Sequence, residues 1–117
     1  MIQQKTLLKI ADNSGAKIAE CIKVYKEKKL GSTILVAIKE RKSKSKLKKG
    51  GIHKAIIIRL KKENIRKNSH LLAFDENAAV LLNLKGDIQG TRLIGPVTNE
   101  IRKQNLIKIL SLAAQIL

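Results

Sequence analysis

The chain has 117 residues, with 25 lysines and arginines against 9 aspartates and glutamates, so its formal net charge is +16 at pH 7. One cysteine excludes an internal disulfide framework, two histidines are too few to suggest a zinc site, and no stretch approaches the roughly 18 to 20 apolar residues of a membrane span. With 44% hydrophobic residues, the composition predicts one small domain over 1–117 that binds a polyanion and no membrane.

The N-terminal part predicts two strands around a tight turn. Residues 5–11 alternate loosely and end at Asp12 to Gly15, whose polar side chains can bond their own backbone and whose glycine permits positive φ. In the next strand, 17–24, alternation predicts a core face and a cationic face. Glu20 interrupts the core face, so we expect it at a barrel rim or paired with a lysine. The expected core residues are Ile18, Ile22 and Val24, opposite Lys17, Ala19, Cys21 and Lys23.

Two further strands are predicted in the middle of the chain, over 33–38 and 52–60. Ile56 to Ile58 are contiguous and β-branched, which favours a strand with apolar neighbours on both faces. Such a strand belongs in a barrel or sandwich. Because successive strand residues point to opposite faces, we expect Ile58 inside a barrel and Ile57 under C-terminal helices or the basic loop.

The connection between these strands is strongly basic. Most charge runs are solvated surface, but at a net charge of +16 a run of cations after the single acid Glu40 indicates a nucleic-acid interface, with lysines acting as point charges on phosphate. Lys17 on the cationic face, and two residues of the polar connection that follows, extend this expectation. The predicted binding residues are Lys17, Arg41, Lys42, Lys44, Lys46, Lys48, Lys49, Lys54, Arg66 and Lys67.

The aromatic content restricts the kind of nucleic acid. The chain has one phenylalanine, one tyrosine and no tryptophan. Proteins that grip single strands usually offer several aromatic side chains on which bases stack. We therefore expect a folded, double-helical target that is read by its shape and phosphate spacing.

The C-terminal third predicts short strands and then helices. Asn68-Ser69 is a candidate hairpin turn, followed by strands over 71–74 and 78–82 and a turn at 85–87. Pro96 indicates the start of one helix, and Asn105 is a candidate N-cap for a second. The second helix has an apolar face that can cover an open end of the barrel, formed by Leu106, Ile109, Leu110 and Ala113.

An enzymatic function finds little support. Four acids could in principle hold Mg²⁺ for a nuclease, but each lies in a turn, where bonding to local backbone is the commoner role; these are Asp12, Asp75, Glu76 and Asp87. Cys21 has no histidine at a defined spacing and is expected to be a small buried apolar residue. We expect no catalytic residue, no metal site and no cofactor.

Four stretches in the same order resemble the universal large-subunit ribosomal protein fourteen family: ADNSGA near the start, the span 55–81, GTRLIGPV and KILSLA. The central signature is carried by Ala55, Ile56 to Ile58, Asn68-Ser69, Phe74, Asn77, Val80 and Leu81. The chain departs from the pattern at Ser69, Glu76 and Gln115, and its hairpin around 26–32 is shorter than in bacterial members.

This resemblance implies a mainly β fold, a small five-stranded β-barrel over about 1–92 with two short C-terminal helices over about 95–117. It implies a structural constituent of the large ribosomal subunit, bound to large-subunit rRNA and to neighbouring ribosomal proteins. By the same resemblance, Thr91, Arg92 and Lys108 face small-subunit rRNA in an intersubunit bridge, where a ribosome-silencing factor also docks. From Gly90 and Gly95 at its ends, we expect this segment to raise Thr91 and Arg92 while Leu93 and Ile94 reach inward.

Two alternatives stay open at the level of sequence. An architectural DNA- or RNA-binding protein outside the ribosome would share the charge, and a nuclease would need its carboxylates clustered in space. The chain uses 20 lysines but only 5 arginines and is rich in isoleucine and asparagine. That bias, with a start that reads as structure and not as a presequence, favours a mitochondrial or plastid ribosome, with a bacterial cytoplasm as the alternative.

Overall fold

The computed structural model describes residues 4–25, 30–43, 47–61, 64–65, 71–74, 76–83, 85–97 and 107–112. At 64–65, 71–72, 107–108 and 110 it describes the backbone and not the side chain.

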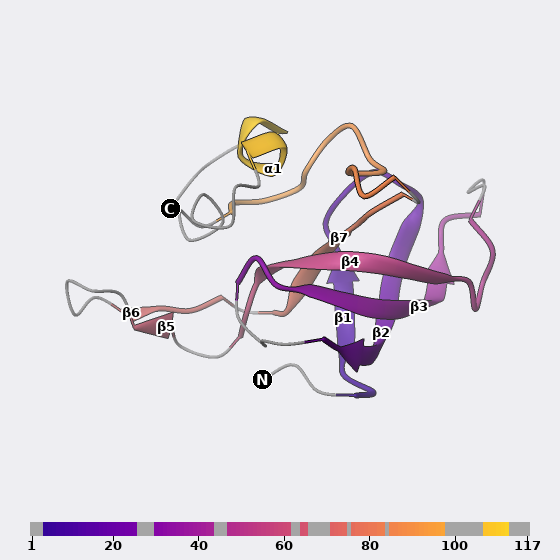
Figure 1. Cartoon of the computed structure of the whole chain (residues 1–117), viewed down its shortest axis with the longest axis horizontal. Coiled ribbons are helices and arrows are strands. Elements are labelled where there is room, and N and C mark those ends of the chain that lie inside the picture. The colour runs from indigo at the N-terminus through magenta and orange to yellow at the C-terminus, as the bar shows by residue number, and fades with distance from the viewer. Residues whose placement is uncertain are drawn as a thin grey trace.

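Five strands form a closed barrel, as predicted. They are β1 (Leu7–Ile10), β2 (Ala16–Val24), β3 (Thr33–Arg41), β4 (Ile52–Arg59) and β7 (Ala78–Leu81). Neighbours around the barrel run in the order β1-β2-β3-β4-β7, and all pairs are antiparallel except β1 with β7, whose parallel pairing closes the ring (Figure 1). Closure leaves no unpaired strand edge in this sheet.

A short hairpin lies apart from the barrel (Figure 1), and its second strand falls within the predicted strand 71–74, whereas the predicted strand 78–82 contributes β7 to the barrel. The hairpin's strands are β5 (Asn64–Ile65) and β6 (Leu71–Leu72), paired antiparallel. The predicted turn Asn68-Ser69 lies between them, outside the described residues.

One helix, α1 (Ile107–Leu112), falls within the second predicted helix. The first was expected from Pro96 onward, but Pro96 and Val97 are not helical, and 98–106, with the candidate N-cap Asn105, lie outside the described residues. Val97 is instead fully buried, packed with Ile109 of α1.

Two apolar clusters lie on opposite sides of the barrel wall. The inner cluster fills the barrel with alternate residues of all five strands, including Leu8, Ile38 and Ile57. The outer cluster joins Ile58 and Val80 to Val97 and Ile109. The helix therefore covers the outer face of β4 and β7, and not an open end of the barrel as we expected.

The predicted orientation of Ile57 and Ile58 is thus wrong. Both are fully buried, so the strand does have apolar neighbours on each face, but Ile57 points into the barrel and Ile58 toward the helix. Successive side chains do alternate between the two faces, as predicted, but the inward and outward positions are exchanged. The choice of face is set by cross-strand pairing, here Ile57 with Ala79, which a run of three isoleucines does not encode.

The predicted faces of β2 are also corrected. Ala19 and Cys21 are fully buried in the inner cluster, whereas Ile18 and Ile22 lie partly exposed outside, and Val24 packs at the cluster's margin. Register shifts along the pairing of β2 with β3 break the simple alternation. A five-stranded barrel is also narrow, so small side chains fit its interior. Cys21 is the small buried residue expected.

Candidate nucleic-acid interface

The basic connection between β3 and β4 is anchored at several points. At its start the backbone N–H of Lys42 donates to the carbonyl oxygen of Gly15 at 2.8 Å. At its end Gly50 and Gly51 exchange backbone hydrogen bonds with Ile38, at 2.7 and 3.0 Å. Leu47 is buried in the inner cluster. These anchors fix the described part of the loop against the barrel, so it is not a freely solvated charge run.

The anchored loop and two strands enclose a basic hollow of about 330 Å³. Lys17 comes from β2, Lys39 and Arg41 from β3, and Lys49 from the loop; Ser43 and the single acid Glu40 complete the lining. Pairing of Ala16 with Arg41 and of Ile18 with Glu40 explains why Lys17 lies here. We call this concavity the basic hollow; its four cations are Lys17, Lys39, Arg41 and Lys49.

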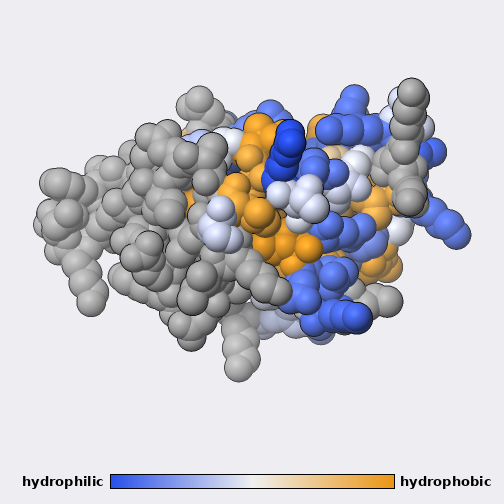
Figure 2. Space-filling model, turned by 90° about the horizontal axis from the view of Figure 1, so that it is seen from above, coloured by the Kyte–Doolittle hydropathy of each residue, from blue (hydrophilic) through white to orange (hydrophobic). Residues whose placement is uncertain are grey.

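Hydrophilic side chains gather at the end of the molecule where β3 passes into the basic loop. Figure 2 shows hydrophilic side chains gathered toward the end of the molecule where, in Figure 1, the chain passes from β3 to β4. Four cations around one carboxylate attract phosphate.

Sequence reasoning missed Lys39. Its amino group lies 3.6 Å from a carboxylate oxygen of Glu20, the ion pair predicted for that acid. Both side chains are partly exposed, so this pair is worth at most about 1 kcal/mol and leaves Lys39 able to bind phosphate. A signal was present: Lys39 lies two residues before Arg41, so the two side chains share a face of β3.

The other predicted binding residues are dispersed. Lys42 lines a neighbouring hollow, and Lys48 is exposed on the loop. Lys54 lies on β4, where it lines a third hollow. Four others lie outside the described residues: Lys44, Lys46, Arg66 and Lys67. The structure thus brings together Lys17, Arg41 and Lys49 out of the predicted set.

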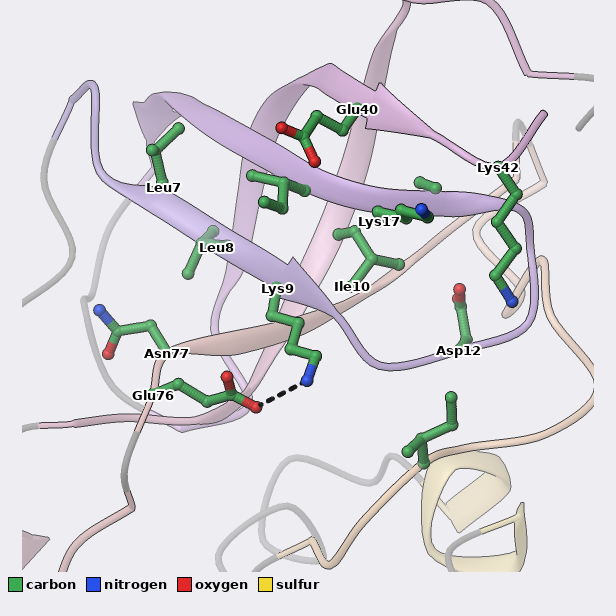
Figure 3. Close-up of a pocket in the computed structure, with 13 residues that line it drawn as sticks. Leu7, Leu8, Lys9, Ile10, Asp12, Lys17, Glu40, Lys42, Glu76 and Asn77 are labelled. Atoms are coloured by element: carbon green, nitrogen blue, oxygen red, sulfur yellow. Dashed lines mark ion pairs between the residues drawn. The ribbon is translucent and has the colours of Figure 1, made fainter.

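The neighbouring hollow, of about 500 Å³, has balanced charge (Figure 3). Lys17 and Lys42 line it together with Asp12 and Glu40, and Lys9 pairs with Glu76 at 3.5 Å. Its walls are otherwise largely aliphatic. Opposite charges in similar number make it a poorer phosphate site than the basic hollow.

The turn between β1 and β2 holds the later segment 91–94. Asn13 accepts hydrogen bonds at its Oδ1 from the backbone N–H groups of Thr91 and Arg92, at 2.7 and 3.1 Å, and its Nδ2 donates to the hydroxyl of Thr91 at 2.9 Å. Ile94 donates its backbone N–H to the carbonyl oxygen of Ala11 at 2.6 Å. Thr91 and Arg92 are therefore exposed on a fixed backbone.

The inward direction predicted for this segment is half right. Leu93 is buried in the outer cluster, but Ile94 is 58% exposed. Asp12 and Leu93 form an isolated antiparallel bridge, and in such extended backbone neighbouring side chains point to opposite sides.

Asp12 has a structural role, as predicted. It is buried, and its Oδ1 accepts hydrogen bonds from the backbone N–H and the hydroxyl of Ser14, at 3.1 and 2.5 Å, while its Oδ2 accepts from the backbone N–H of Leu81 at 3.1 Å. Among the described residues no three histidines, cysteines or acids gather as a metal-binding group. Asp75 lies outside that part of the chain.

Two glycines allow the segment its close approach. A Cβ at Gly90 would lie 2.8 Å from both Asn13 Oδ1 and Asp12 Cβ. Gly95 has a φ of +85°, and a Cβ there would collide with the guanidinium of Arg59. Arg59 is itself buried, and its Nε finds no hydrogen-bond partner among the described residues. Burial lowers the pKa of the Arg59 guanidinium, and the negative charge of Glu76 opposes that shift.

Lys108 lies in α1, but its side chain is not among those described. Within the described part of the chain, no helix is both long enough and apolar enough to cross a membrane.

Comparison with known families agrees with the fold and the motifs. The sequence model described as ribosomal protein L14p/L23e matches residues 1–117, which is the full length of the sequence. The matched range includes both partners of the contact between the β1–β2 turn and the 91–94 segment. The chain therefore belongs to the ribosomal protein L14p/L23e family, structural proteins of the large ribosomal subunit.

Proposed function

We propose that this ribosomal protein binds large-subunit rRNA through the basic hollow. Its four cations come from three separate stretches of sequence and face one concavity with a single acid, Glu40. This convergence is the observation that carries the proposal. Lysines and arginines held at the surface by a rigid barrel release counterions when they neutralise phosphates, and they position the protein without reading bases.

The salt dependence of binding tests the hollow. Lys17, Arg41 and Lys49 are changed together to glutamine, and binding to naked large-subunit rRNA is measured from low to moderate salt. Each lost phosphate contact flattens the log-log slope by roughly 0.7 to 0.9, so the variant should lose about 2 to 3 units of slope. A control changes Lys5, Lys61 and Lys85, which removes the same charge elsewhere. Equal losses in both variants would show that only the overall charge matters.

The segment at Thr91 and Arg92 is proposed as the bridge to small-subunit rRNA, together with Lys108. The hydrogen bonds from Asn13 support this role because they hold the backbone of an exposed arginine in place. A guanidinium can grip phosphate bidentately where an ammonium cannot. A silencing factor that blocks subunit joining would compete for the same segment.

We place this ribosome in a mitochondrion or plastid, with a bacterial cytoplasm as the alternative. The preference for lysine, isoleucine and asparagine supports that placement. Imaging of a tagged chain in its host, with an organelle marker, tests it directly.

A further inference from the structure

The outer face of β2, β3 and β4 carries a strip of apolar and charged side chains that the proposed rRNA site does not use. Cross-strand pairing aligns Leu35 of β3 with Lys23 and Lys54, and aligns Ala37 with Glu20 and Ile52. Ile52 is 63% exposed, the largest exposure among the large apolar residues of the described chain. In Figure 1, β3 and β4 cross in front of the other barrel strands, with the opposite faces of these two strands turned into the barrel.

A hollow of about 820 Å³ extends from this strip to the turn after β7. Leu35, Ile52 and Lys54 line it from β3 and β4, and Asn83, Lys85 and Gln89 line it from the turn after β7. Asn83 binds two later residues of this turn, because its Oδ1 accepts hydrogen bonds from the backbone N–H groups of Lys85 and Asp87, at 2.9 and 3.0 Å.

The charge of this hollow is one-sided. Lys54 on β4 and Lys85 in the turn after β7 are both exposed, and no carboxylate is found among the described residues that line it. Glu20, the acid in the strip beside it, is already paired with Lys39. An occupant must therefore supply both negative charge and apolar surface.

These two requirements favour protein over RNA. The basic hollow places four cations around about 330 Å³, whereas this hollow has two lysines around about 820 Å³ and an aliphatic wall. Phosphates laid against Leu35 and Ile52 would lose water without gaining a partner. Among the described residues that line it, His53 offers the single ring on which a base could stack, whereas proteins that grip single strands usually offer several.

We propose that this hollow docks an acidic segment of a neighbouring large-subunit protein. An aliphatic or aromatic anchor of that segment covers Ile52 and Leu35, and its carboxylates meet Lys54 and Lys85. This inference rests on the proposed ribosomal function and adds a protein-binding surface distinct from the basic hollow.

Photocrosslinking in assembled subunits tests the occupant. Ile52 is replaced by p-benzoylphenylalanine in a tagged chain, large subunits are purified and irradiated, and the crosslinked segment is identified by mass spectrometry. Leu7, which is 58% exposed on β1, is the matched control position. We expect position 52 to crosslink to an acid-rich segment of one ribosomal protein that position 7 does not reach. Crosslinks to rRNA, or none at position 52, would overturn the inference.

Charge reversal tests the electrostatic part. The pair Lys54→Glu and Lys85→Glu should lower the yield of that crosslink at least about tenfold, since like charges then face each other across the interface. The control pair Lys5→Glu and Lys61→Glu should leave it unchanged. An equal yield in both would overturn the assignment. Absence of the chain from large subunits would instead refute the proposed function, and this inference with it.

Discussion

Asn13 and Thr91 hold each other by two hydrogen bonds of opposite direction. Asn13 accepts from the backbone N–H of Thr91 at 2.7 Å and donates to its hydroxyl at 2.9 Å. The residues are 78 positions apart in the sequence, so this contact ties the first turn of the barrel to the segment proposed as a bridge. It makes the position of Arg92 a property of the barrel and not of a free loop.

Removing this contact should affect subunit joining more than rRNA binding. Asn13→Ala loses three hydrogen bonds near the surface and should lower the free energy of unfolding by about 1 to 3 kcal/mol. Large subunits carrying the variant should join small subunits less well. Asn83→Ala is the control, because it also removes hydrogen bonds from an asparagine Oδ1 to backbone N–H groups, here those of Lys85 and Asp87. A joining defect of equal size in both variants would argue against a role for the Asn13 contact.

Arg92→Glu tests the bridge itself. Arg92 is exposed, so its replacement should leave the barrel folded and its incorporation into large subunits nearly intact. Repulsion from small-subunit phosphate should weaken association of the two subunits, most visibly at low Mg²⁺, in sucrose-gradient profiles. Subunit association of Arg92→Lys particles should lie between that of the unchanged protein and that of Arg92→Glu, since a lysine keeps the charge but not the bidentate fork. Normal joining of Arg92→Glu particles at every Mg²⁺ level would remove Arg92 from the bridge.

The two faces of β4 give a stability prediction. Ile57→Ala and Ile58→Ala each empty a fully buried site and should cost about 2 to 5 kcal/mol in denaturant unfolding. Ile52→Ala on the same strand should change stability by no more than about 0.5 kcal/mol, because its side chain is already mostly in water. Similar losses at all three positions would contradict the exposure of Ile52 and the burial of Ile57 and Ile58.

Turn signals predicted where strands begin and end, the run of isoleucines left a barrel or a sandwich open, and the family resemblance implied the barrel. Asp12 is an example of such a turn signal, because its carboxylate accepts hydrogen bonds from Ser14, as the turn composition indicated. Its further hydrogen bond, from the backbone N–H of Leu81, could not be predicted without the fold. Orientation was harder to predict. β2 has apolar residues on both faces and β-bulges in its pairing, so the placement of Cys21 inside and Ile22 outside depends on the neighbouring strand.

The candidate site was predictable in part for a related reason. A run of cations predicted a loop that binds an anion, but the run does not tell which cations converge. Lys39 lines the basic hollow because β3 pairs with β2 there. Lys54 does not line it, because β4 places Lys54 on another part of the surface. Convergence depends on contacts between distant stretches, which a local charge pattern does not contain.

Crosslinking from the basic hollow in whole cell extracts tests the central claim most directly. A photoreactive residue at Lys17 or Lys49, in a tagged chain, would be irradiated before fractionation, and both the sedimentation of the chain and the sequence of the crosslinked nucleic acid would be read. We predict that the chain sediments with the large subunit and that its crosslinks map to a confined region of large-subunit rRNA. Sedimentation away from ribosomes, or crosslinks spread over DNA or unrelated RNA, would contradict the account.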